Sequence, residues 1–252
     1  MAYKRKKKNS FAKFATTLIA ILIAFLGAYF VAPEVLNPTA STTVPSAVDI
    51  SSIPEYSGSA YVQVNGGTPF FKESDYTTEA YEHYSDLDAL GRCGVVMACL
   101  GKETMPAEGE DRESINNVTP SGWVQKKYDA SIVSGGWLYN RCHLIGWQLS
   151  AENDNERNLI TGTRYFNAGN SEEQGMLLFE NMVADYIKET GNHVIYRVTP
   201  VFEGSNLVAS GILMEAYSVE DNGEGICFNV YFYNVQPGIE IDYATGESRI
   251  AN

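Results

Sequence analysis

Hydrophobic and polar positions change their spacing several times along the chain, and each change marks a predicted element. The longest apolar run, FATTLIAILIAFLGAYFVA, spans Phe14 to Ala32 without a charged residue. As a helix rising 1.5 Å per residue it would extend about 28 Å, close to the thickness of one hydrocarbon core. We therefore predict a single membrane-spanning helix over residues 14–32.

Beyond residue 57 the pattern is that of short strands separated by turns. The predicted strands cover Ser59–Val64, Cys93–Leu100, His193–Phe202, Asn206–Val219 and Ile226–Val235. Asn65-Gly66-Gly67 follows the first strand and predicts a hairpin-type turn. Glu203-Gly204-Ser205 separates the third strand from the fourth and predicts a hairpin.

One clear helix interrupts these strands. In the segment GMLLFENMVADYIKETGN, apolar residues recur at helical spacing and Gly191 marks the end. The predicted apolar stripe consists of Phe179, Met182, Val183, Tyr186 and Ile187. Strands on both sides of one helix favour an α+β fold with a central antiparallel sheet.

Charge and composition divide the chain into four parts. Residues 1–13 carry a charge of +6 and no acid, and this basic flank places the N-terminus in the cytoplasm. After the transmembrane segment, residues 33–56 are rich in Pro, Ser and Thr and predict an extended stalk. Residues 57–252 form the main domain, which we expect on the extracellular side. The alternative is a cleaved signal peptide, which would release the domain.

The net charge limits what the domain can bind. The whole chain has a formal net charge of -13, and the part after residue 13 holds 12 basic and 31 acidic residues, a net charge of -19. This excludes a basic protein that simply coats nucleic acid. Contact with DNA or RNA would therefore require a few placed cations or a metal ion.

The chain has three histidines, of which one stands in a distinctive context. His83 lies among polar and acidic residues, and His193 begins a predicted strand, so both have structural explanations. His143 lies in WLYNRCHLIGWQL, where an arginine precedes it by two residues. By itself such a histidine is more often a core residue than a catalyst.

The residues around and after His143 change that interpretation. Asn140-Arg141-Cys142-His143, Asn158-Leu-Ile, Phe166-Asn167-Ala-Gly169 and Phe179-Glu180 together resemble the DNA/RNA non-specific endonuclease family, the ββα-metal or His-Me finger class. The resemblance covers roughly residues 59–237 and extends to membrane-anchored Gram-positive members. It implies a ββα-metal nuclease fold, a DNA substrate with RNA as a second one, and cleavage without sequence preference.

The resemblance also implies roles for particular residues. His143 would be the general base, since its ordinary pKa lies near neutral pH. Asn167 would be the protein ligand of a hydrated Mg²⁺, which Mn²⁺ could replace. Glu180 would hold a metal-bound water, and Arg141 would stabilise the phosphate. Arg112 would do the same, with an exposed ion pair to Asp111 or Glu113 as the alternative.

Two residues depart from the family signature, Asp-Arg-Gly-His. Asn140 replaces the aspartate expected to orient the histidine or its strand, and an asparagine can still accept a hydrogen bond. Cys142 replaces the glycine, which is tolerable unless the backbone there needs a positive φ. Glu180 also lies farther from Asn167 than the family pattern suggests, because residues 171–174 lengthen the loop.

Local cations and aromatics could form a groove on the acidic domain. The candidate cations are Arg112, Lys126, Lys127, Arg141, Arg157 and Arg164, of which Arg164, Lys126 and Lys127 are the predicted substrate-binding residues. The nearby aromatics are Trp123, Trp137, Tyr139, Trp147 and Tyr165. They could stack on bases, although a core position is the better explanation for most of them.

The four cysteines favour no zinc site. Cys142 and His143 are adjacent, so on a strand their side chains point to opposite faces. Cys93 and Cys99 lack the CxxC spacing. We expect buried free thiols at all four positions, with a disulfide between Cys93 and Cys99, or between another pair, as the alternative.

The sequence therefore predicts a single-pass membrane protein with an extracellular, metal-dependent nuclease domain and no specific protein partner. The alternative from another class is a catalytically silent surface domain that binds nucleic acid or a wall polymer. A third hypothesis, a toxin-like effector nuclease, lacks any sequence feature for delivery or immunity.

Overall fold

The computed structural model describes residues 53–170 and 175–251, all within one compact unit, residues 44–252. The transmembrane helix predicted over residues 14–32 and most of the predicted stalk lie outside the described residues. Within the described part of the chain, no helix combines the length and the hydropathy that a membrane crossing requires.

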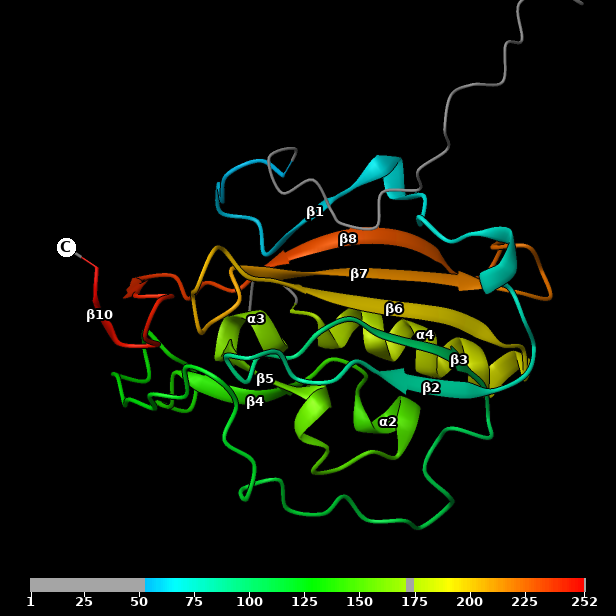
Figure 1. Ribbon diagram of the computed structural model, residues 1–252, viewed down its shortest axis with the longest axis horizontal. Helices are drawn as coiled ribbons and strands as arrows, with labels where there is room; N and C mark the ends of the chain where they lie inside the picture. Colours follow the sequence, from blue (N-terminus) through cyan, green and yellow to red (C-terminus); the bar gives the residue numbers. More distant parts are fainter. Residues whose placement is uncertain (1–52, 171–174, 252) are drawn as a thin grey trace, which may run out of the picture. The chain divides into compact units, whose positions relative to one another are not determined.

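A six-stranded antiparallel sheet forms the centre of this unit (Figure 1), with the strand order β1-β8-β7-β6-β3-β2. Its strands are β1 (Tyr61–Gln63), β2 (Tyr81–Tyr84), β3 (Val96–Leu100), β6 (Val194–Val201), β7 (Gly211–Ser218) and β8 (Cys227–Tyr233). The strands β6, β7 and β8 pair as successive neighbours, in register over seven or more residues. The mixed fold with a central antiparallel sheet is therefore confirmed.

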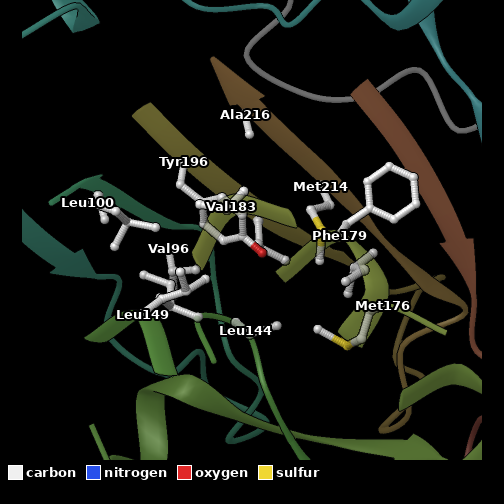
Figure 2. Packing of buried hydrophobic residues seen from close by; sticks show 14 of the residues in the cluster. Val96, Leu100, Leu144, Leu149, Met176, Phe179, Val183, Tyr196, Met214 and Ala216 are labelled. Carbon is white, nitrogen blue, oxygen red and sulfur yellow. The ribbon is translucent and has the colours of Figure 1, made fainter. Parts of the chain in front are cut away.

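The long helix α4 (Leu177–Thr190) packs on one face of the sheet. Phe179, Val183 and Ile187 from the helix meet Tyr196 and Met214 from the strands in the main hydrophobic core (Figure 2). The helix ends at Gly191, which adopts the left-handed conformation with φ 77°. This conformation is one that glycine adopts without steric cost, so the residue explains the end of the helix.

The opposite face of the sheet carries a smaller cluster built on Val201, Leu213, Tyr231 and Tyr233. The described end of the predicted stalk contacts this cluster. Tyr233 donates a hydrogen bond to the carbonyl of Pro54 at 2.6 Å, and its ring meets that of Tyr56 edge to face. Residues 53–56 therefore run along the domain.

A second, two-stranded ribbon lies on the same side of the sheet as α4 (Figure 1). Strand β4 (Tyr139–His143) pairs antiparallel with β5 (Leu159–Thr163), and α3 (Arg164–Ala168) follows directly. The Thr163 side chain accepts a hydrogen bond from Phe166 N at 3.0 Å and caps the helix. Two strands and a helix in immediate succession form the compact frame that holds the predicted site.

The remaining elements are short. They are α2 (Trp147–Ser150), the 3-10 helices η2 (Asn65–Gly67), η3 (Glu73–Asp75) and η4 (Glu156–Asn158), and the small ribbon of β9 (Ile239–Ile241) and β10 (Ser248–Ile250). A core of Val133, Leu138, Tyr139 and Ile239 joins this C-terminal ribbon to β4.

Most of the predicted elements are present, with two corrections. The hairpin around Gly204 is confirmed as β6–β7. The hairpin turn at Asn65–Gly67 is wrong, because β1 pairs with β8 and the turn is a 3-10 helix. Met182 is 44% exposed and does not belong to the apolar stripe. Its predicted place is taken by Ala184, which is buried, because the buried face lies further round the helix than the stripe suggested.

Candidate active site

His143 lies at the end of β4 and is nearly buried, with 6% of its surface exposed. Its two ring nitrogens have different partners. Nε2 lies 2.9 Å from the carbonyl oxygen of Asn153, and Nδ1 lies 3.0 Å from Nη2 of Arg112. A carbonyl oxygen can only accept and a guanidinium can only donate, so Nε2 carries the hydrogen and Nδ1 the lone pair. The ring is therefore held as a neutral base.

The protonation state of His143 follows from its surroundings. Burial lowers the pKa of His143 to about 4, and the positive charge of Arg112 adds to the lowering. The hydrogen bond to Asn153 opposes this effect without cancelling it. At neutral pH the imidazole is consequently unprotonated, which is the state that can take a proton from water.

Two loops hold Arg112 and His143 in this arrangement. Asn153 contributes two hydrogen bonds to this arrangement. Its main-chain oxygen accepts one from His143, and its side-chain oxygen accepts one from the main-chain amide of Glu113 at 2.8 Å. A further hydrogen bond, from Asn117 to Asp154 at 2.8 Å, ties the same two loops together. Arg112 makes no ion pair with its neighbours Asp111 and Glu113 within the described structure, so the alternative proposed from the sequence is not what the geometry shows.

Asn158 fixes the chain immediately after His143. It is fully buried, and its side-chain oxygen accepts hydrogen bonds from the amides of Leu144 and Ile145 at 3.1 and 2.9 Å. Its amide nitrogen donates to the carbonyl of Ile145 at 3.0 Å. Leu144 N also donates to the main-chain oxygen of Asn158 at 2.9 Å, so the main chain and the side chain of Asn158 together hold the segment that follows His143.

Glu180 is buried in the first turn of α4, with 5% of its surface exposed. Burial raises the pKa of Glu180 to about 7, while a hydrogen bond from Gln148 Nε2 at 3.2 Å and the charge of Arg112 oppose the rise. A buried carboxylate with so little compensation is a group that a nearby cation would stabilise.

A groove of about 750 Å³ lies beside Arg112, and neither His143 nor Glu180 is among its lining residues. It is lined by Arg112, Ile115, Asn116, Trp123, Gln125, Trp137, Tyr139, Asn140, Arg141, Arg164 and Asn167. Arg112 connects it to His143. The structure thus brings Arg112, Asn167 and Arg164 to one surface, although they are far apart in the sequence.

Two asparagines that line this groove have side-chain oxygens without a hydrogen-bond partner in the described structure. Oδ1 of Asn140 is buried and has no hydrogen-bond partner, and the Asn167 side chain makes no hydrogen bond within the described structure. The expectation that Asn140 orients His143 is wrong, because the Asn153 carbonyl performs that task. Amide oxygens left without partners are hard ligands of the kind that Mg²⁺ accepts. Among the described residues, no three His, Cys, Asp or Glu side chains lie together as a metal site.

The predicted cations occupy different positions. Arg141 lines the groove, but its guanidinium donates to the carbonyls of Val118 and Asn116 at 2.5 and 3.2 Å. It also lies 4.3 Å from the ring centre of Trp123, so much of it serves to hold the loop. Arg164, at the start of α3, has no side-chain hydrogen bond or ion pair in the described part and projects into the groove.

Neither predicted lysine is among the groove-lining residues. Lys126 donates to the carbonyl of Ser248 at 2.8 Å and so ties the groove wall to β10. The Lys127 ammonium lies 4.5 Å from the ring centre of Trp137 and reaches the groove only through that ring. Arg157 pairs with Asp86 at 3.1 Å, in a surface ion pair.

Cys142 is accommodated without strain. Its φ is negative, so the strand does not need glycine there. The thiol points toward Gly162 on β5, where an added Cβ would lie 2.5 Å from Sγ. Burial raises the pKa of Cys142 far above its usual value, which excludes the thiolate needed for nucleophilic attack. Within the described residues all four cysteines are free, and Cys227, contrary to expectation, is exposed.

Asn153 and Gln148 are the groups that sequence reasoning missed. Asn153 acts through its main-chain oxygen, which every residue type possesses, so no sequence signal could identify it. Gln148 follows His143 by five residues on a short helix, and only the packing of α2 against α4 brings it to Glu180.

Comparisons with known proteins agree with this geometry. A family model described as DNA/RNA non-specific endonuclease matches residues 72–220. Structures of NucA from Streptococcus agalactiae, with no metal bound and with magnesium ion bound, are 25% identical to this chain, with TM-scores of 0.67 and 0.68. Both matches cover 80% of this chain and 92% of NucA.

The structure of Sda1 nuclease with bound zinc ion is 27% identical, with a TM-score of 0.63, and the match covers 76% of this chain and 96% of Sda1. All of these structures are of nucleases. The family match spans more than half of the chain. The chain therefore belongs to the DNA/RNA non-specific endonuclease family.

Proposed function

We propose that this protein hydrolyses phosphodiester bonds of DNA, and of RNA as a second substrate, without sequence preference and with a divalent cation. The observation that carries the proposal is the fixed tautomer of His143, which turns a lone pair at Nδ1 toward Arg112, a residue that lines the groove. A domain that only binds nucleic acid does not require a buried, neutral imidazole with a fixed partner at each ring nitrogen.

In the proposed mechanism, Nδ1 of His143 takes a proton from a water molecule. The water oxygen forms a bond to phosphorus, and the bond from phosphorus to the leaving 3′ oxygen breaks. Arg112 holds the phosphate next to the base, and its charge keeps His143 unprotonated until that proton arrives. The proton transfer can occur only to Nδ1, because Nε2 is committed to Asn153.

The residues present fit a hydrated divalent cation. Asn167 would hold it directly through its amide oxygen, and Glu180 would bind one of its water molecules. When bound, such a cation neutralises charge on the phosphate and on the leaving oxygen. NucA has been solved with magnesium and Sda1 with zinc. The oxygen donors of this site favour Mg²⁺, and the absence of a thiol or imidazole cluster from the described residues favours it over Zn²⁺.

The experiment incubates the full-length protein with plasmid DNA, single-stranded DNA and RNA, in Mg²⁺ and in EDTA. We expect cleavage of all three with Mg²⁺, fragments without sequence preference, and no cleavage in EDTA. Full activity in EDTA would contradict the metal, and inactivity with every divalent cation would favour the silent binding domain instead.

We also propose that residues 14–32 anchor the protein in the cell membrane and that the nuclease domain faces outward. The support is the uncharged run of 19 residues after a +6 flank. Protease added to intact cells should remove the domain and leave the N-terminal segment. Recovery of most of the protein from the medium would indicate cleavage and secretion.

A further inference from the structure

Trp137 is an exposed side chain that the catalytic groups leave without a role. It is 49% exposed and lines the same groove as Arg112, Asn167 and Arg164. A single exposed tryptophan is ordinary on a protein surface. Two features of Trp137 require an explanation. It lies in the same groove as Arg112 and Arg164, and its backbone is held in a fixed turn.

The backbone presents Trp137 rigidly. Gly136, directly before it, has a φ of 80°, a conformation in which side chains other than glycine are strained. On one side of Trp137, Gly136 accepts a hydrogen bond from Tyr128 N at 2.8 Å. On the other, Leu138 N donates to Lys126 O at 3.1 Å. The indole thus stands on a fixed turn rather than on a loose loop.

The three aromatic residues that line the groove differ in how much of each ring is accessible. Tyr139 is 2% exposed and belongs to the small core, and the ring of Trp123 is covered by the guanidinium of Arg141. Trp137 is covered by Lys127 at 4.5 Å. A cation over an indole occupies only one face and leaves the other face available to a flat partner.

We propose that Trp137 stacks on an unpaired nucleobase, so that the groove prefers single-stranded nucleic acid to duplex. This inference rests on the proposed function, in which Arg112 holds the phosphate; Arg164 lines the same groove and could contact a neighbouring phosphate of the bound strand. A base in a duplex is covered on both faces by its neighbours and must be unstacked before it can reach an indole. A base in a single strand stacks on an aromatic side chain without that cost.

The test measures binding rather than turnover. In EDTA, the full-length protein is titrated into three labelled ligands, a single-stranded oligonucleotide, the same strand with every base removed, and the matching duplex. We expect Trp137→Ala to weaken binding of the single strand about tenfold, as loss of one base–aromatic stack typically does. Binding of the abasic strand and of the duplex should change by less than about twofold.

Two further variants keep the test specific. Trp137→Phe retains a flat ring and should keep most of the affinity for the single strand. Tyr56→Ala removes an exposed aromatic side chain from the opposite face of the sheet and should change none of the three affinities. Equal losses for the normal and abasic strands, or no loss with Trp137→Ala, would overturn the stacking role. A protein that binds as expected but cleaves nothing would refute the nuclease proposal alone.

Discussion

Arg112 donates a hydrogen bond to Nδ1 of His143, the nitrogen that takes a proton from water in the mechanism we propose. The two residues are 31 positions apart, and Arg112 comes from an exposed loop while His143 ends a strand. In the free protein the arginine therefore covers the lone pair and lowers the pKa of the imidazole. A bound phosphate would compete with Nδ1 for this guanidinium and free the base when substrate is present.

Substitution of His143 is the first test of this arrangement. His143→Ala should lower kcat by about 10²–10⁴, the usual contribution of a general base. Binding of DNA in EDTA should change little, since in the proposed mechanism Arg112, and not His143, holds the phosphate. His83→Ala, an exposed histidine on β2, is the matched control and should retain full activity. An active His143→Ala protein would contradict the mechanism.

Substitution of Arg112 should change the pH profile as well as the rate. Removing a positive charge next to His143 raises the imidazole pKa above about 4, so the acidic limb of kcat/KM should move to higher pH. Arg112→Ala should also lower kcat/KM by about 10- to 100-fold, in line with the loss of a charged hydrogen bond. An unchanged acidic limb would mean that Arg112 does not act on the base.

Glu180 should make the metal-free protein less stable as the pH rises. Its folded pKa is about 7 against an ordinary value of 4.5. Below about pH 4.5 the folded and unfolded states both hold the proton. Between 4.5 and 7 only the folded state does, so the free energy of unfolding falls across this interval by at most about 3 kcal/mol.

Glu180→Gln removes this dependence and keeps the shape of the side chain. In EDTA the variant should match the wild type near pH 4.5 and exceed it in denaturant unfolding near pH 8. His143 titrates with the opposite sign, but both proteins contain it, so the difference isolates Glu180. Glu189→Gln, an exposed position on the same helix, should show no such gain. Equal stability of Glu180→Gln and wild type at both pH values would refute the raised pKa.

Metal binding should be visible without catalysis. A site with one neutral protein ligand binds Mg²⁺ weakly, so millimolar Mg²⁺ should raise the melting temperature of the wild type in a concentration-dependent manner. Asn167→Ala should abolish the increase, and Glu180→Ala should reduce it. Asn206→Ala, in the β6–β7 loop, is the control and should respond as the wild type does. A normal Mg²⁺ response in Asn167→Ala would place the ion elsewhere.

Cys142 and Gly162 should behave as a packing pair. An alanine at Gly162 would put its Cβ 2.5 Å from Sγ of Cys142 and 2.7 Å from the Phe166 ring. We expect Gly162→Ala to lower the free energy of unfolding by about 1–3 kcal/mol, as overpacking typically does. Cys142→Gly should stay within a few fold of the wild-type rate and, combined with Gly162→Ala, should recover part of the loss. Additive effects in denaturant unfolding would contradict the contact.

The sequence alone determined the elements that depend on local pattern. The period of apolar residues predicted α4 and the strands β3, β6, β7 and β8, because burial of one face repeats along a helix or strand. Gly191 predicted the end of the helix, because glycine adopts the left-handed conformation found there without steric cost. The resemblance of the surrounding motifs to a nuclease family singled out His143, Asn167 and Glu180 as candidates.

The tertiary structure decided how these candidates are placed. Which nitrogen of His143 carries the lone pair depends on a carbonyl of Asn153, and whether Arg112 reaches that nitrogen depends on the path of an irregular loop. Arg141 and Lys126 proved to bind main-chain carbonyls, while Trp137 stayed exposed. The period of apolar residues shows which face of a helix or strand is buried. Hydrogen bonds between loops depend on where distant segments meet, and that information exists only once the chain has folded.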